Sequence, residues 1–133
     1  MPADAPRPRV AIVDYELGNL FSVQRACERA GLEALVTADA REIAAADAVI
    51  LPGVGAFGDA MATLRRRDLV GALREVAAAD RPLFGICLGL QLLLSESEEF
   101  GAHEGLGIIP GRVIRLRTAT EGPRALTRED SRK

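Results

Sequence analysis

Short apolar runs alternate with amphipathic stretches along most of the chain. The run RVAIVD at residues 9–14 is β-branched and almost continuous, which is typical of a strand buried on both faces. Further strands are predicted over residues 32–36, 48–51 and 83–86. Helices are predicted over residues 20–29 and 41–46, and one or two more over residues 59–67 and 69–78. Because parallel strands need crossover connections, this alternation predicts an α/β fold with a mainly parallel sheet flanked by helices.

The pattern weakens after the apolar, helix-like run at residues 88–94. Residues 95–105 are polar and are predicted to form a loop. Residues 106–110 and 112–116 are expected to form two short strands joined by a Pro110-Gly111 turn.

Both ends of the chain lack a core pattern. Residues 1–8 contain Pro2, Pro6 and Pro8 and no apolar stretch, so they are expected to form a disordered lead rather than a signal peptide. From Arg117 onward only Ala119, Ala125 and Leu126 are hydrophobic, which predicts a disordered tail over residues 117–133. The folded part is therefore expected to be a single partial domain at residues 9–116.

Composition narrows the function classes. The chain has 133 residues, 48% hydrophobic and 27% charged, and a net charge of -2 with scattered basic residues, so we expect no nucleic-acid partner. The longest apolar region, residues 83–94, is too short to span a membrane. Two distant cysteines and one histidine argue against a disulfide framework and a metal site, and they favour a reducing cytoplasm.

Cys87 is the candidate nucleophile. It lies in Gly85-Ile86-Cys87-Leu88-Gly89, between a predicted strand and the helix-like run. A sharp strand-to-helix turn of this kind leaves no room for neighbouring Cβ atoms, exposes the central side chain and aims the free NH of Leu88 at whatever bonds to it. The alternative is a buried, inert cysteine, and Cys27 is expected to be one because it lies on the apolar side of its helix.

A second glycine motif follows the third predicted strand. Residues 53–58, GVGAFG, satisfy GxGxxG, which taken alone suggests a dinucleotide-binding turn. That interpretation is weakened because the strand is not the first, Pro52 stiffens the entry, and no acidic residue ends a strand about twenty positions later. The competing interpretation is a flexible loop whose amide, with that of Leu88, forms an oxyanion hole, each donor contributing about 3 kcal/mol in the transition state.

Together these motifs resemble the class I (triad) glutamine amidotransferases. The elbow followed by Gln91-Leu92-Leu93 is similar to that whole family. Three further features are similar to the glutaminase subunits of imidazole glycerol phosphate synthase. They are the loop of Pro52 and residues 53–58, the upstream pairs and triplets Asp14-Tyr15 and Gly18-Asn19-Leu20, and Leu90, where other branches of the family carry histidine. The resemblance implies a flavodoxin-like sheet that is incomplete at the C-terminus. Glu16 departs from the family, which often has glycine there.

The resemblance also implies an activity and a set of site residues. It implies hydrolysis of glutamine to glutamate and ammonia through a thioester on Cys87, with no cofactor. Backbone amides of Gly53, Val54, Gly55 and Leu88 would form the oxyanion hole, and Gln91 and Glu99 would hold the substrate's amino-acid end. A β/α-barrel cyclase subunit, as partner in a heterodimer, would use the ammonia to form imidazole glycerol phosphate and AICAR in histidine biosynthesis.

The general base of that family is missing from this sequence. The family completes its triad with a His-x-Glu motif on a later strand, and the chain ends before one occurs. His103, the only histidine, is expected to be a solvated loop residue. We therefore expect a truncated or frameshifted product that is inactive alone and that either aggregates or depends on a partner for stability. The alternatives are a non-catalytic binding or scaffold module and a dinucleotide-binding domain.

Overall fold

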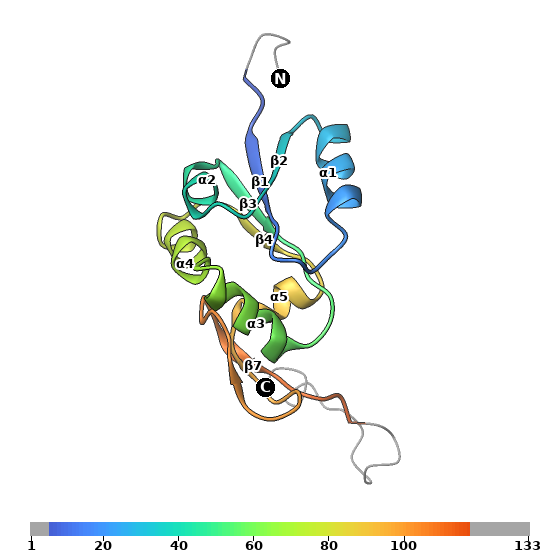
Figure 1. The fold of residues 1–133 in the computed structure, drawn as a ribbon, viewed down its shortest axis with the longest axis vertical. Coiled ribbons are helices and arrows are strands. Elements are labelled where there is room, and N and C mark those ends of the chain that lie inside the picture. The colour runs from blue at the N-terminus through green and yellow to red at the C-terminus, as the bar shows by residue number, and fades with distance from the viewer. Residues whose placement is uncertain (1–5, 118–133) are drawn as a thin grey trace.

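The computed structural model describes residues 6–117 of the chain, and these form a parallel sheet with helices on both faces and a second, smaller sheet (Figure 1). In chain order the elements are β1 (Arg9–Val13), α1 (Leu20–Arg29), β2 (Glu33–Thr37), α2 (Ala40–Ala45), β3 (Ala48–Leu51), α3 (Phe57–Arg66), α4 (Val70–Ala78), β4 (Leu83–Gly85), α5 (Leu88–Leu92), β5 (Leu94–Ser97), β6 (His103–Glu104) and β7 (Ile109–Val113).

The main sheet has the strand order β2-β1-β3-β4, and every neighbouring pair is parallel. This is the order of the first four strands of a flavodoxin-like fold, so the predicted α/β class is confirmed. In the dinucleotide-binding order the third strand lies beyond the second, whereas here β2 and β3 flank β1 on opposite sides. The sheet therefore does not have the order that the dinucleotide-binding alternative requires.

The two faces of the main sheet are covered unequally. On β1, Ala11 and Val13 face a large buried cluster to which α2, α3, α4 and α5 contribute. Val10 and Ile12 face the other way, where, within residues 6–117, the buried cluster has one further member, Cys27 of α1. Figure 1 shows α1 on the opposite side of the sheet from α2 and α4. Cys27 is thus a core residue as predicted, and burial raises the pKa of its thiol.

The region predicted as a polar loop at residues 95–105 forms two strands instead. The helix after the elbow ends at Leu92, and β5 begins at Leu94 and pairs antiparallel with β6 through Ser97 and His103. The prediction was wrong because this sheet is small and its strands are polar and largely exposed. Charged side chains on such strands pair across the sheet rather than mark a loop, and Glu96 lies 3.8 Å from Arg112 of β7.

The two strands predicted at residues 106–110 and 112–116 are one strand, β7, which runs through the expected turn. β7 pairs parallel with β5, and the register shifts between Leu94 and Glu96 so that Pro110 and Gly111 lie opposite a single residue, Ser95. Gly111 has φ 143°, and its amide donates to the Ser95 hydroxyl at 3.3 Å. Pro-Gly therefore marks a β-bulge on an edge strand, where proline removes no essential ladder bond.

Most of the two predicted terminal segments lies outside the described residues. Residues 1–5 of the lead and residues 118–133 of the tail are not described, so the domain limits at residues 9–116 stay a prediction. Among the helices of residues 6–117, none combines the length and the apolar character needed to cross a bilayer.

Candidate active site

Cys87 lies at the turn between β4 and α5 and has the backbone geometry of a nucleophile elbow. Its φ of 55° and ψ of -118° are strained for a non-glycine residue, a conformation that costs about 1–3 kcal/mol and persists only where the surroundings impose it. The residue is exposed, and its thiol is free. It is therefore not the buried cysteine of the inert alternative.

Glycines at both flanks of Cys87 are required by packing. A Cβ on Gly85 would stand 2.6 Å from the Leu90 Cα, and a Cβ on Gly89 would overlap the carbonyl oxygen of Leu51 at the end of β3. The start of α5 therefore packs directly on the carboxyl end of the neighbouring strand. This confirms the expectation that the turn leaves no room for neighbouring Cβ atoms.

The glycine loop, which we define as residues 52–58, lies beside the elbow as predicted. The Leu88 amide donates to the Gly53 carbonyl oxygen at 3.3 Å, so the two loops meet at the same edge of the sheet. The expectation of a free Leu88 NH is therefore wrong for this conformation. The sequence indicated that the two loops are close but gave no signal for the orientation of the Gly53 peptide.

Tyr15 supports the glycine loop from beneath. Its side chain is fully buried, and its hydroxyl donates to the Pro52 carbonyl oxygen at 2.6 Å. An added Cβ on Gly53 would clash with the same hydroxyl, so packing explains this glycine and no bound phosphate is needed to account for it. Burial raises the pKa of Tyr15. Sequence reasoning used Tyr15 only as part of the family resemblance and did not identify this contact.

Beyond Gly53 the loop is open to solvent. Val54 is 53% exposed, Gly55 has φ 101°, and a Cβ on Gly55 would meet no atom within 4 Å. Within residues 6–117 the amides of Val54 and Gly55 donate to no acceptor. Two of the predicted oxyanion donors are therefore available in this conformation.

The last glycine of the GxGxxG motif has a packing reason as well. A Cβ on Gly58 would stand 2.8 Å from the ring of His103, which packs against the first turn of α3. His103 is half-buried, and its Nε2 lies 3.3 Å from the Phe100 carbonyl oxygen. The expectation of a solvated loop histidine is thus wrong, because β6 holds the ring against the helix.

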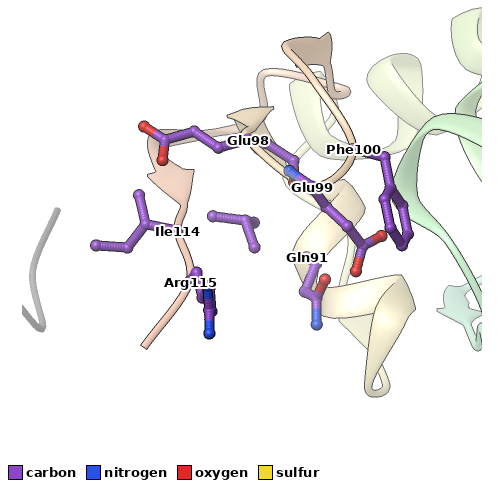
Figure 2. Close-up of a pocket in the computed structure, with 8 residues that line it drawn as sticks. Gln91, Glu98, Glu99, Phe100, Ile114 and Arg115 are labelled. Carbon is purple, nitrogen blue, oxygen red and sulfur yellow. Dashed lines mark hydrogen bonds between the residues drawn. The ribbon is translucent and has the colours of Figure 1, made fainter. Parts of the chain in front are cut away.

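Gln91 and Glu99 border a cavity of about 610 Å³ between α5 and the small sheet. The cavity is lined by Gln91, Ser97, Glu98, Glu99, Phe100, Val113, Ile114 and Arg115. Figure 2 shows the Gln91 amide and the Glu99 carboxylate on one side, with Ile114 and Arg115 across from them. The structure therefore brings the two predicted substrate-binding residues to one cavity. Gln91 lies one helical turn along α5 from Cys87, which is not itself among the lining residues.

Glu99 also bonds to the end of the glycine loop. Its Oε1 accepts from the Phe57 amide at 2.8 Å, at the first residue of α3. Ala56, which precedes Phe57 at the N-cap position, has no side chain that could cap the helix. Glu99, 42 positions further along the chain, caps it instead. The missing local cap was the only sequence signal for this contact.

No base is bonded to the nucleophile in the described part of the chain. Between residues 6 and 117 the Cys87 thiol has no hydrogen bond to a histidine or carboxylate, and the ring of His103 packs on Gly58 instead. Also within these residues, no group of three or more histidine, cysteine or acidic side chains is arranged to hold a metal ion. The site as described contains a nucleophile and amide donors.

Glu16, the departure from the family pattern, lies in the turn that leads from β1 to α1. It has φ 75°, a left-handed conformation that favours glycine, and its carboxylate lies 2.6 Å from the Arg67 guanidinium at the end of α3. Both side chains are partly exposed, at 59% and 34%, so the ion pair contributes less than about 1 kcal/mol. The turn itself is preserved.

Comparisons with known proteins agree with this geometry. Residues 9–128 match the family described as "CobB/CobQ-like glutamine amidotransferase domain". The chain is 53% identical over 112 residues to imidazole glycerol phosphate synthase subunit HisH of Rhodopirellula baltica, covering 84% of this chain and 55% of that protein. It is 57% identical over 114 residues to the subunit of the same name from Moorella thermoacetica, covering 86% of this chain and 54% of that protein.

A solved structure described as "Crystal structure of glutamine amidotransferase" superposes with a TM-score of 0.68 and 22% identity, over 84% of this chain and 59% of the other. At that identity the match concerns the fold. The chain spans about half the length of the curated relatives that it matches.

Proposed function

This chain belongs to the CobB/CobQ-like glutamine amidotransferase domain family, and we propose that it carries the nucleophile and oxyanion loop of a glutaminase site. The observation that carries the proposal is the exposed Cys87 thiol, held at φ 55° by two glycines that packing requires. In the proposed reaction the thiolate attacks the side-chain amide of glutamine. Ammonia leaves, a thioester forms on Cys87, and water then releases glutamate.

Stabilising the tetrahedral intermediate requires a change at the glycine loop. In the described conformation the Gly53 carbonyl oxygen accepts from Leu88, so it presents an acceptor where a negative oxygen needs donors. We propose that the Gly53 peptide turns away and frees the Leu88 amide to act with those of Val54 and Gly55. The open space around Gly55 and its φ of 101° support such a movement.

Gln91 and Glu99 are proposed to hold the amino-acid end of the substrate. The Gln91 amide can donate to the α-carboxylate of glutamine, and a Glu99 oxygen that is not bonded to Phe57 can accept from the α-ammonium group. This arrangement favours free glutamine over a glutamine side chain within a protein, because only the free amino acid carries both charges.

The partner and pathway are proposed from the similarity to the synthase subunits. We propose that the ammonia passes to a β/α-barrel cyclase subunit in a heterodimer, which uses it to form imidazole glycerol phosphate and AICAR in histidine biosynthesis. A reducing, cytoplasmic location fits Cys27 and Cys87, both of which are free thiols.

The second candidate function is a non-catalytic binding module. It is favoured by one observation, the lack of a base bonded to Cys87 within residues 6–117. We expect the 133-residue polypeptide to have negligible glutaminase turnover, because within residues 6–117 no base is bonded to Cys87, and a nucleophile without its base commonly loses several orders of magnitude in kcat.

Covalent labelling tests the glutaminase site without requiring turnover. The quantity to measure is the alkylation rate with a chloroketone analogue of glutamine divided by the alkylation rate with iodoacetamide. For Cys87 this ratio should exceed the ratio for a free thiol by about tenfold or more. Gln91→Ala should remove that preference, and Gln24→Ala on α1 should retain it. If Cys87 shows the same ratio of rates as a free thiol, there is no glutamine pocket, and the binding-module function is the better account.

A further inference from the structure

Ser97 is a buried polar residue at the end of β5, a strand whose preceding residues are more exposed. Its side chain is 1% exposed, whereas Ser95 and Glu96 are exposed. A hydroxyl that is removed from water costs free energy unless it is hydrogen-bonded. The Ser97 Oγ accepts from the Glu99 amide at 3.1 Å, two residues further along the chain. The buried hydroxyl therefore contacts a residue that lines the cavity beside α5.

The backbone of Ser97 is fixed from both sides. β5 is the middle strand of the small sheet, and Ser97 lies opposite His103 of β6 and Val113 of β7. The Glu98 amide donates to the Val113 carbonyl oxygen at 3.1 Å, which continues the pairing one residue beyond the strand. Ser97 is thus a fixed point from which the chain turns toward the cavity.

The turn that follows holds Glu99 from two directions. The Ser97 hydroxyl accepts from its amide, and its Oε1 accepts from the Phe57 amide at 2.8 Å. A serine that bonds the amide two residues on forms an ST turn, which replaces a backbone turn. Phe100 and Gly101 then have φ 53° and 102°. For Phe100 this conformation costs about 1–3 kcal/mol and persists only where the surroundings impose it.

His103 supports the far end of the turn without replacing Ser97. Its Nε2 lies 3.3 Å from the Phe100 carbonyl oxygen, and its ring packs on Gly58. Neither contact reaches the Glu99 amide, whose acceptor within residues 6–117 is the Ser97 hydroxyl. Removal of that hydroxyl therefore frees the peptide that precedes Glu99.

These contacts leave one oxygen of the Glu99 carboxylate for a ligand. Across residues 6–117, Oε2 accepts no hydrogen bond, and Glu99 lines the same cavity as Gln91. The donor on Oε1 is a neutral amide, so it brings no positive charge to offset that of the carboxylate. A carboxylate held in this way has a defined direction for a charged donor such as an ammonium group.

We propose that Ser97 is a positioning residue of the substrate subsite, whose hydroxyl holds Glu99 where its carboxylate meets the α-ammonium group of glutamine. The inference rests on the proposed glutaminase function and deepens it, since it identifies what makes Glu99 selective. Ser97 acts through Glu99 and lowers the cost of ordering a flexible side chain when the substrate binds. Loss of the hydroxyl should therefore weaken recognition of the ammonium group and leave the thiol of Cys87 as reactive as before.

The experiment measures how strongly labelling of Cys87 depends on the ammonium group. Two probes are applied to the full chain, the chloroketone analogue of glutamine and the same chloroketone without its α-amino group. The ammonium preference is the second-order labelling rate constant of the first divided by that of the second. Ser97→Ala should lower this preference by about tenfold, which matches the cost of ordering one flexible side chain.

Two further readouts separate positioning from a general loosening of the fold. In Ser97→Ala the half-saturating concentration of the glutamine analogue should rise, while its maximal labelling rate and the iodoacetamide rate stay the same. Ser95→Ala is the matched control, because Ser95 is an exposed residue of the same strand whose hydroxyl accepts from Gly111 instead. The control should keep the ammonium preference within about twofold.

A double-mutant cycle tests whether Ser97 acts through Glu99. Glu99→Gln keeps an oxygen that can accept from Phe57 but removes the charge, so this variant should lose the ammonium preference. Adding Ser97→Ala to Glu99→Gln should then cause no further loss. Additive losses would overturn the proposal, as would an unchanged preference in Ser97→Ala.

The unsubstituted chain gives a test that does not depend on the folding of a variant. After correction for intrinsic rates, the Glu99 amide should exchange with solvent more slowly than the Phe100 amide, which donates to no acceptor within residues 6–117. Equal protection of the two amides would contradict the proposal. If the unsubstituted chain reacts with the glutamine analogue no faster than a free thiol does, the glutaminase site itself is refuted. If it reacts faster and Ser97→Ala keeps the ammonium preference, only the role of Ser97 is refuted.

Discussion

The Tyr15 hydroxyl donates a 2.6 Å hydrogen bond to the Pro52 carbonyl oxygen beneath the glycine loop. Both residues are buried, so the carbonyl oxygen cannot exchange this partner for bulk water. The bond fixes the loop at its first residue, and the open space around Gly55 leaves the later residues free to rearrange. Because Pro52 is fixed and the residues around Gly55 are not, the Gly53 peptide can rotate without displacing the start of the loop.

Tyr15→Phe should destabilise the chain by about 1–3 kcal/mol, because it leaves the Pro52 oxygen buried without a donor. Urea denaturation measures this loss. If Tyr15 also positions the oxyanion loop, the variant should lose part of the labelling preference for the glutamine analogue while its iodoacetamide rate stays the same. Wild-type stability in Tyr15→Phe would show that the hydrogen bond contributes nothing.

The same residue predicts how stability changes at alkaline pH. Burial raises the pKa of Tyr15 in the folded state above its ordinary value near 10, so the unfolded state releases this proton first. The contribution of the Tyr15 proton to the free energy of unfolding is therefore fully present below about pH 10 and falls as the pH rises above it. Burial also raises the pKa of the Cys27 thiol, so its contribution to stability has the same sign and is lost as the pH rises above its ordinary value of 9.0. In Tyr15→Phe the decline above pH 10 should be shallower than in the wild-type chain.

Gly89→Ala should disrupt the elbow, because the new Cβ would overlap the Leu51 carbonyl oxygen. We expect a loss of about 2 kcal/mol or more in unfolding free energy and slower labelling of Cys87 by the glutamine analogue. Gly71→Ala is the matched control, since Gly71 lies in α4 with no atom within 4 Å of the added Cβ. That control should be stabilised by about 0.5–1 kcal/mol. Equal effects of the two substitutions would refute the packing argument.

Glu99→Ala should cost about 0.5–2 kcal/mol, because it removes the only side-chain cap that we find on α3 within residues 6–117. Glu98→Ala tests the neighbouring carboxylate, which is exposed and pairs with Arg112 at 3.2 Å, and should change stability by less than about 0.5 kcal/mol. Thermal melts of the two variants give the comparison. A larger loss in Glu98→Ala would mean that the bond to Phe57 is unimportant.

Glu16→Gly and Glu16→Ala separate backbone strain from the ion pair with Arg67. Both variants lose the ion pair, so they differ mainly in whether a Cβ is present at φ 75°. We expect the glycine variant to be the more stable by about 1 kcal/mol, since alanine keeps the strain. If the alanine variant is as stable as the glycine variant, the left-handed conformation at this turn carries no cost.

The elements with strong local signals could be predicted from the sequence. The run at residues 9–14 and the helix at residues 20–29 follow from apolar periodicity, and the observed helix has these same bounds. The elbow was predictable because glycines on both sides of Cys87 allow close packing that other residues forbid. Each of these signals lies within a few positions of the residue that it describes.

The errors concern features that depend on distant partners. Residues 95–105 were assigned to a loop because polar strands lack an apolar alternation, and Pro-Gly was assigned to a turn because its bulge exists only against β5. The bond from Leu88 to Gly53 and the cap from Glu99 to Phe57 join segments 35 and 42 positions apart (88 minus 53, and 99 minus 57). Single-sequence patterns contain no record of such pairings.

Pro110 has a consequence for self-association of the small sheet. Because proline carries no amide hydrogen and the bulge kinks the strand, the outer side of β7 cannot present an unbroken ladder of donors to another molecule. β6, at the other border, has only two residues. Within residues 6–117, neither border of the small sheet therefore offers a template for fibril-like growth. Of the two described sheets, the four-stranded one, which ends in the apolar strand β4, is where we expect aggregation to begin.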